Sequence, residues 1–362
     1  MVGVDVELDE VVERLGFSEE GRDWFRGISV GEGVTAWVSA LELPADEEGV
    51  IAGVSGFELP ADEAVGLMEF CGVVEVDRRE MLAARPDVEA EADWWAVTAA
   101  LAGSVEREWE KAVRSTGFEA WPAVPMESSA VGLFAGAWAL LACVPRLIEV
   151  HARRGVPEAV TVATVSALGG VMGTHRHIFG RAGVGLIPLW SPPLRFRSTD
   201  FEIGRHAFTR AQLGIGDGVS GHVLMMHVPP TGQLDARASE ESVAEATRLF
   251  ETCYPEEPVA AFVCHSWLLD PNLAEYLSAD SNILRFQRRF ELLPLLPMKD
   301  PSEGDREMMR LGLHLSVPWD GPLTEDDLAR VPQETSLQRA FVSHLRSGEH
   351  WQLRTGILRK AS

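Results

Sequence analysis

Cysteine is scarce in this chain of 362 residues, and its four cysteines form no C-x-x-C pair. Cys71, Cys143, Cys253 and Cys264 are spread over the chain and provide neither a disulfide framework nor a zinc-binding motif. This usage is typical of a reducing compartment, so we expect a cytoplasmic protein. The N-terminal stretch MVGVDVELDEVVERLGF is acidic and lacks an apolar core, so we expect no signal peptide.

Hydrophobic runs long enough to cross a bilayer are also missing. The longest apolar run covers residues 130–144 and is shorter than the roughly 18–20 residues that a membrane helix needs. Because the run is apolar on every side, it predicts a helix buried inside the protein.

Metal-binding and phosphate-binding patterns are absent as well. No H-E-x-x-H motif occurs, and His175 and His177 lie on a predicted helix, where residues two apart point to nearly opposite sides. We therefore expect no metal site. The glycines at 214, 216 and 218 lie between two predicted strands, so they predict a hairpin turn and not a phosphate loop.

Basic residues are few relative to acidic ones, with 32 Lys and Arg against 55 Asp and Glu and a net charge of -23. Residues 1–120 alone hold 28 acidic and 9 basic residues, a difference of -19. Such a surface repels nucleic acids and anionic membranes, so we expect neither as a partner. A solvated acidic surface that keeps the protein soluble explains the charge best.

The patterns that are present divide the chain into two regions. Residues 1–130 carry helix signals, such as the amphipathic stretch from residue 91 to the glycine at 117. Residues 131–362 add several strand patterns to the helices. We predict a mainly helical domain over 1–130 and a mixed sheet with flanking helices over 131–362. The fold class is therefore α/β (α+β).

A strand–helix–strand unit stands out in the second region. Residues 222–228 and 259–266 predict short buried strands, and the helix between them carries an apolar stripe that ends near Cys253. Ser239, followed by two glutamates, is the expected cap at the start of this helix. A helical crossover of this length predicts that the two strands are parallel neighbours.

Reactive side chains follow both strands where they end. The first strand ends near His227, and the second ends in Cys264, His265 and Ser266, followed by Trp267. Ligands bind beyond the carboxyl ends of parallel strands, so we predict a site there. His227 or His265 is the candidate for proton transfer, and the alternative for each is a hydrogen-bonded structural histidine.

Alternation along a strand constrains the other candidates. Cys264 and Ser266 share one face and His265 points to the opposite face, which argues against a Cys264–His265 nucleophile pair. A buried cysteine acting as a small hydrophobe is the alternative for Cys264. Trp267 is a candidate substrate contact, and the alternative is packing.

Three segments resemble a bacterial acyltransferase-like family. They are HVPPTGQLD (227–235), CHSWLLDPNLAEYLSADSNILRFQRRFEL (264–292) and ETSLQRAFVSHLRSGEHWQLRTGIL (334–358). Members of that family join a helical N-terminal domain to a C-terminal domain of the GNAT superfamily. The similarity is strongest over residues 190–293.

The resemblance implies a GNAT fold, in which two central parallel strands separate and hold the arm of an acyl-thioester. Acyl-CoA or acetyl-CoA is then the implied co-substrate, without a metal. Main-chain groups of Met226, His227 and Val228 are implied to hold the thioester. The loop at Thr231 and Gly232, with the start of the Ser239 helix, is implied to bind pyrophosphate.

The chain departs from the superfamily in two respects. Its glycine-rich pyrophosphate loop is missing, since residues 228–239 contain only Gly232. No tyrosine stands at an obvious general-acid position, because the chain has only Tyr254 and Tyr276. An acyl carrier protein is therefore an alternative donor. A non-catalytic GNAT-like module that binds an acyl-thioester or a partner protein is the alternative function.

The resemblance leads to a hypothesis for the chemistry. An acyl group moves from the thioester to an amine of a small molecule or protein, and His227 or His265 accepts the proton of the amine, directly or through a water. Ser266 or Cys264 protonates the leaving thiolate. Asn282 either orients the acceptor or holds a turn.

Overall fold

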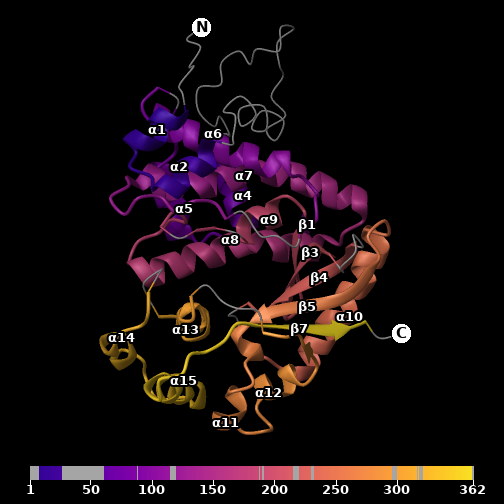
Figure 1. Cartoon of the computed structure of the whole chain (residues 1–362). Helices are drawn as coiled ribbons and strands as arrows, with labels where there is room; N and C mark the ends of the chain where they lie inside the picture. The colour runs from indigo at the N-terminus through magenta and orange to yellow at the C-terminus, as the bar shows by residue number, and fades with distance from the viewer. Residues whose placement is uncertain are drawn as a thin grey trace. The chain divides into compact units, whose positions relative to one another are not determined.

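The computed structural model of the chain is shown in Figure 1. It describes residues 8–26, 61–87, 89–114, 120–186, 188–189, 191–214, 220–229, 232–295, 300–315, 317 and 321–360. The chain divides into two compact units, Met1–Phe201 and Glu202–Ser362.

The first unit is built from helices, as the sequence predicted for its N-terminal part. They are α1 (Leu8–Arg14), α2 (Glu19–Arg26), α4 (Ala61–Phe70), α5 (Glu75–Ala83), α6 (Ala92–Arg107), α7 (Ala130–Arg154), α8 (Glu158–Phe179) and α9 (Ser191–Phe196). A two-residue strand, β1 (Val113–Arg114), is the other regular element of this unit before residue 200 within the described ranges.

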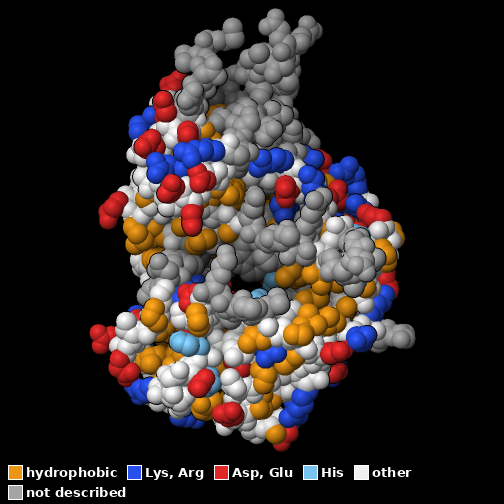
Figure 2. All heavy atoms as spheres, viewed as in Figure 1, with side chains coloured by type: hydrophobic (Ala, Val, Ile, Leu, Met, Phe, Trp, Pro, Cys, Tyr) orange, Lys and Arg blue, Asp and Glu red, His pale blue; other side chains and the backbone are white. Residues whose placement is uncertain are grey.

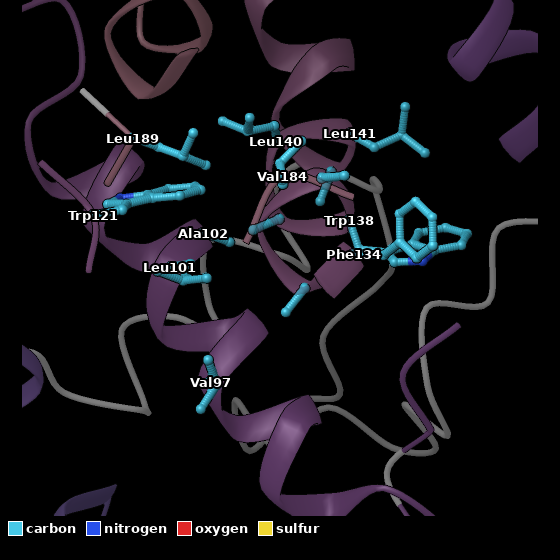
Figure 3. Packing of buried hydrophobic residues seen from close by; sticks show 14 of the residues in the cluster. Val97, Leu101, Ala102, Trp121, Phe134, Trp138, Leu140, Leu141, Val184 and Leu189 are labelled. Atoms are coloured by element: carbon cyan, nitrogen blue, oxygen red, sulfur yellow. The ribbon is translucent and has the colours of Figure 1, made fainter. Parts of the chain in front are cut away.

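Helix α7 is the centre of the first unit's core. Its side chains pack among those of α6 and of the segments that surround α7, as Figure 3 shows for Phe134, Trp138, Leu140 and Leu141. In the described part of the chain it is the one helix long and apolar enough to cross a membrane, yet 83% of its most apolar stretch is buried inside the protein. The predicted buried helix is confirmed, and it is longer than the apolar run because it continues to Arg154.

The packing of α7 also places the boundary between the units. From the sequence, the division was predicted after residue 130, at the start of this helix. The structure divides after Phe201 instead, because α7 packs against α6 and α8 and shares one hydrophobic core with them. An apolar run predicts that a helix is buried, but it does not predict which of the two units the helix belongs to.

Acidic and basic side chains are interspersed on the face of the first unit seen in Figure 2. Many of them form ion pairs, such as Arg14 with Asp93 at 2.6 Å and Arg78 with Glu69 at 3.0 Å. These pairs have exposed members, and each contributes little to stability. The acidic excess is therefore a solvated surface, as the composition suggested.

The second unit combines a mixed sheet with helices, which confirms the predicted α/β class. Its strands are β3 (His206–Gly214), β4 (Ser220–His227), β5 (Val259–Ser266), β6 (Glu291–Leu292) and β7 (Arg354–Arg359), with β2 (Asp200–Ile203) at the junction pairing with β3. Its helical segments are α10 (Ala236–Cys253), η1 (Trp267–Leu269), α11 (Leu273–Tyr276), α12 (Asn282–Gln287), α13 (Glu303–Glu307), η2 (Met308–Gly312), α14 (Glu325–Ala329) and α15 (Ser336–Arg346).

Within this unit the sheet has the order β3-β4-β5-β7-β6. Strands β4 and β5 are parallel, as the strand–helix–strand pattern predicted, and the other neighbours in this order are antiparallel. Strands β3 and β4 are antiparallel neighbours up to Gly214 and Ser220, as expected of a hairpin. The turn itself, residues 215–219, lies outside the described residues.

The start of α10 differs from the expectation. Its N-cap is Asp235, whose carboxylate accepts a hydrogen bond from the main-chain N–H of Ala238 at 2.8 Å. Ser239, the predicted cap, lies inside the first turn and is buried. Aspartate and serine are equally good N-cap residues, so the residue type alone could not show which of the two begins the helix.

Candidate active site

The parallel strands β4 and β5 separate before either one ends. Their last ladder pair is Met225 with Val263. Beyond that pair, β4 stays bonded to β3 as far as His227, and β5 stays bonded to β7 as far as Ser266. Two strand ends are thus held on their outer sides, while the ladder between them stops at Met225 and Val263.

Side-chain alternation assigns the residues at this gap to its two faces. Paired residues of adjacent parallel strands share a face, so Met225 and Val263 point the same way. His227 and His265 each lie two residues further along and therefore flank the gap on that same face. Met226 and Cys264 point to the opposite face. The sequence named both histidines, but only the register shows that they share a face.

The two histidines differ in their surroundings. His265 is exposed, and its Nδ1 hydrogen-bonds the hydroxyl of Thr355, its partner on β7, at 2.8 Å. His265 is solvent-exposed as a residue, but partial desolvation of its ring lowers the pKa, and the nearby carboxylate of Glu303 opposes this shift. His227 is half-buried, with Nε2 3.0 Å from the hydroxyl of Thr209. His265 is thus the more accessible of the two and is uncharged at neutral pH.

Cys264 and Ser266 are less suited to the roles predicted for them. Cys264 is buried, and its burial together with the charge of Glu307 raises the pKa of the thiol to about 12, so it is a weak acid. The Ser266 hydroxyl accepts a hydrogen bond from Leu268 N at 3.1 Å and so begins η1. Both residues fit structural roles at the end of β5.

The two candidate substrate residues lie apart. Trp267 is buried, and a methyl group added at Gly312 would lie 2.6 Å from its indole ring, so it packs against η2. Asn282 is exposed in the first turn of α12, and the cap of that helix is Ser281. The turn is therefore held by Ser281, while a contact of Asn282 with the acceptor stays a prediction.

The segments that carry the resemblance brace the end of β5. The buried carboxylate of Asp270 accepts hydrogen bonds from the main-chain N–H groups of Asn272 at 2.9 Å and Gln352 at 2.7 Å. The side-chain amide of Gln287 donates to the carbonyls of Leu268 and Asp270, both at 2.8 Å. These bonds tie η1, which follows β5 in the chain, to α12 and to the approach to β7.

Those residues predicted to hold the cofactor that the structure describes lie at the open end of β4 and around the start of α10, and their contact with a cofactor stays a prediction. Met226 is buried and Val228 half-buried, at the open end of β4. Thr231 lies outside the described residues. Gly232 has a φ of +68° and open space around it, a conformation that favours glycine. Ser239 does not begin the helix, but its hydroxyl bonds His206 Nε2 and Arg289 Nη1, both at 2.6 Å.

Two arginines that were not predicted from the sequence lie at the same place. Arg205, in the turn after β2, donates to the carbonyls of Pro229, Gly232 and Gln233 at 3.0, 3.3 and 2.9 Å. Arg289 bonds Ser239 in the first turn of α10. Burial of His206 lowers its pKa to about 3, and the charges of Arg205 and Arg289 add to this shift. Two cations therefore surround the loop and helix start where pyrophosphate was expected.

Glu307, at the end of α13, is a further group that the sequence did not reveal. It is half-buried, and burial and the neighbouring Glu303 raise its pKa to about 7, which Arg310 opposes. Nothing in the segment EGDREMMR (303–310) distinguishes Glu307, because the pKa of its carboxyl group depends on the fold that surrounds it.

Metal ligands are not brought together in the described part of the chain, where no group of three or more His, Cys, Asp or Glu side chains could hold a metal ion. His175 is buried and its Nδ1 hydrogen-bonds the carbonyl of Arg181 at 2.8 Å. His175 is thus a structural histidine.

Comparison with known proteins identifies both parts of the chain. Residues 62–192 match the family model of the N-acyltransferase N-terminal domain, and residues 199–358 match that of the GNAT-like C-terminal domain. No curated protein matches the chain. The class defined by this fold and this gap between strands is that of the GNAT-type acyltransferases that use acyl-CoA.

Solved structures of acyltransferases are similar over nearly the whole chain. One, in complex with decanoyl-CoA and teicoplanin, is 28% identical, covers 97% of this chain and 99% of its own, and has a TM-score of 0.76. A mutant acyltransferase with octanoyl-CoA is 27% identical, with 98% and 99% coverage and a TM-score of 0.77. This chain is an acyltransferase with an N-acyltransferase N-terminal domain and a GNAT-like C-terminal domain, as the resemblance implied.

Proposed function

We propose that this acyltransferase moves a medium-chain acyl group from acyl-CoA to an amine on a glycopeptide-like acceptor. The observation that carries the proposal is the gap between β4 and β5 beyond Met225 and Val263. Decanoyl-CoA, octanoyl-CoA and teicoplanin in the similar structures support the donor length and the kind of acceptor.

The gap suits the thioester arm of the donor. An open strand end presents main-chain N–H groups at fixed positions, and such a group stabilises the oxyanion that forms when a thioester carbonyl is attacked. Met226 and His227 are the β4 residues past the last ladder pair, so their main-chain groups are the candidates. They were also the residues named from the sequence.

The phosphates of CoA fit the cations at the start of α10. The first turn of a helix offers N–H groups and a partial positive charge, and Arg289 adds a full charge beside them. Arg205 holds the preceding loop by three main-chain carbonyls, which supports the loop conformation without a glycine-rich sequence. This arrangement favours CoA over a carrier protein as the donor.

His265 is the proton acceptor that the geometry favours. It is exposed beside the gap, its Nδ1 is oriented by Thr355, and its lowered pKa keeps the ring neutral. The amine of the acceptor loses its proton to this ring as it attacks the thioester carbon. His227 flanks the gap on the same face and is the second candidate.

The direct test incubates the full chain with decanoyl-CoA and teicoplanin and measures CoA release together with the mass of the acceptor. We expect CoA release that depends on the acceptor and a teicoplanin product that is heavier by one decanoyl group. CoA release without any change in acceptor mass would contradict the acceptor class. No release from acyl-CoAs of any length, with teicoplanin or with a panel of other amines, would contradict the proposed reaction.

Arg289 provides a separate prediction for the donor. Replacing Arg289 by glutamine should raise KM for decanoyl-CoA about 10-fold, because one charge-assisted hydrogen bond to phosphate is lost. The same change should leave KM unaltered for the decanoyl thioester of N-acetylcysteamine, which has no phosphate.

The matched control is Arg285→Gln. Arg285 lies in the same segment, and its ion pair with Asp280, 3.7 Å from Nη2 to Oδ1, is exposed and therefore contributes little. Its KM for decanoyl-CoA should equal that of the wild type. Equal KM values for the Arg289 and Arg285 variants would place the phosphates of CoA elsewhere.

A further inference from the structure

The side chain of Arg289 is a cation that the described part of the fold does not neutralise. Arg289 is half-buried, and burial lowers its pKa, which the charge of Glu240 opposes. Among the residues that the structure describes, its hydrogen-bond partner is the hydroxyl of Ser239, and no carboxylate lies within ion-pair distance of its guanidinium. A guanidinium has five N–H donors, so most of them are left for an anion. A partly desolvated charge without a counter-ion is costly, and a bound anion would remove that cost.

Ser239 connects this cation to His206. Its hydroxyl oxygen lies 2.6 Å from Arg289 Nη1 and 2.6 Å from His206 Nε2. A guanidinium can only donate, so the Ser239 oxygen accepts the hydrogen bond from Arg289. The hydroxyl proton is then donated to Nε2, which accepts when the imidazole is neutral and carries its proton on Nδ1. This direction satisfies the three groups together, and the bond from the charged arginine is the stronger of the two.

His206 is fixed as the acceptor at the end of this chain of hydrogen bonds. Its ring is fully buried and lies between Phe208 and Phe286, with ring centres 6.1 and 5.9 Å away. Because burial lowers the pKa of His206 to about 3, the ring is neutral at neutral pH. A neutral ring in a closed aromatic environment holds its Nε2 in one place, so the Ser239 hydroxyl has one orientation.

The three residues belong to three elements of the second unit. His206 begins β3, Ser239 lies in the first turn of α10, and Arg289 follows α12. Helix α10 packs against both β3 and α12. His206 also follows Arg205, whose guanidinium holds three carbonyls of the loop before α10. The start of β3 therefore fixes that loop through one side chain and the cation beside the helix start through the next.

We propose that Ser239 and His206 are positioning residues that hold Arg289 in place for the phosphates of the CoA donor. This inference rests on the proposed function, and it gives Ser239 a role other than the direct phosphate contact implied by the resemblance. The Ser239 hydroxyl donates its proton to His206 and accepts from Arg289, so it acts on the donor through the guanidinium. An arginine that is already held loses less side-chain freedom when the donor binds, which strengthens binding.

The test measures KM for decanoyl-CoA and for the decanoyl thioester of N-acetylcysteamine, with teicoplanin as the acceptor. Ser239→Ala should raise KM for decanoyl-CoA about 3- to 5-fold, because the hydrogen bond that orients a binding group is lost. Two quantities should stay within about 2-fold of the wild type: kcat at saturating decanoyl-CoA, and KM for the thioester without phosphate.

A double variant tests whether Ser239 acts through Arg289. Ser239→Ala combined with Arg289→Gln should have the same KM for decanoyl-CoA as Arg289→Gln alone, about 10-fold above the wild type, because effects within one hydrogen-bonded chain do not add. Two independent roles would multiply the effects to about 30- to 50-fold, which would overturn the proposal.

Two variants of His206 test the other end of the chain. His206→Phe keeps an aromatic ring between Phe208 and Phe286 but removes the acceptor, so KM for decanoyl-CoA should rise as in Ser239→Ala. His206→Gln offers an amide oxygen to the Ser239 hydroxyl and should bring KM back to within about 2-fold of the wild type. Equal KM values for these two variants would overturn the role of His206. This comparison stands even if Ser239→Ala folds poorly, and melting temperatures report folding.

Ser242→Ala is the matched control. Ser242 is buried one turn further along α10, and its hydroxyl donates to the carbonyl of Ile203. Its loss should lower the melting temperature, as the loss of Ser239 does, but leave KM for both donors unchanged. An equal rise in KM for decanoyl-CoA in the two serine variants would show a general effect on α10 and would overturn the proposal.

Calorimetry separates a failure of this inference from a failure of the proposed function. CoA and pantetheine, which carries no phosphate, are titrated into the wild type and into Ser239→Ala. The variant should bind CoA about 3- to 5-fold more weakly and pantetheine equally well. Equal affinities for CoA would overturn the inference, even with a wild type that transfers acyl groups. A wild type that transfers no acyl group would instead overturn the proposed function, whatever the affinities are.

Discussion

Replacing His265 by alanine is expected to lower kcat for acyl transfer about 10²- to 10³-fold while KM for decanoyl-CoA changes little. Positioned general bases contribute rate enhancements of this size. His265 is exposed at the gap and its Nδ1 bonds Thr355. Because His265 must be neutral to accept a proton and its pKa is lowered, the acidic limb of the wild-type kcat profile should lie below about pH 6.5.

Thr355→Val is the control that tests orientation apart from proton transfer. It removes the hydroxyl 2.8 Å from Nδ1 but keeps the ring, so we expect a loss of only about 10-fold. His227→Ala should fall between the two variants, since His227 is half-buried and held by Thr209. A His265→Ala variant with full kcat at every pH would transfer the role to His227 or to water.

Gly169→Ala is expected to destabilise the first unit by about 2–4 kcal/mol, because overpacking against a rigid neighbour forces the backbone to move. A methyl group there would lie 2.0 Å from the carbonyl oxygen of Gly72. Gly169 N also donates a hydrogen bond to Cys71 O at 3.1 Å, so the close approach of α8 to the chain after α4 would be lost.

Gly170→Ala is a matched control one residue further along α8, where an added methyl group meets nothing within 4 Å. It should stabilise the protein by up to about 1 kcal/mol, since alanine favours a helix over glycine. Thermal or urea unfolding measures both changes. Equal melting temperatures for the two variants would show that the α8 contact is looser than the structure indicates.

The sequence predicted the part of the fold that periodicity controls. Two apolar stretches with an amphipathic helix between them were sufficient to predict parallel neighbours, because a crossover of that length allows little else. The side chains at the strand ends were also visible. Their assignment to one face of the gap was not, since it depends on the β4–β5 register, which includes a shift near His222.

The residues that were missed act across long sequence separations. Arg205 reaches carbonyls more than 20 residues away and Arg289 reaches Ser239, and neither arginine stands in a recognisable motif. The pKa of Glu307 is raised by burial, which no local pattern announces. Ser239 was assigned as a cap because serine before two glutamates suits that role, but Asp235 competes for it four residues earlier.

The pairing of β4 with β5 has a mechanical consequence. Among the described strands, the ladder that links the half-sheet of β3 and β4 to that of β5, β7 and β6 is a short seam from His222 and Val259 to Met225 and Val263. An acyl-pantetheine arm in the gap would lie between β4 and β5 beyond Met225 and Val263, where the two strands no longer pair, and would so lengthen the seam. The donor would then act as a removable strand, and loading the enzyme would stiffen the sheet across its middle.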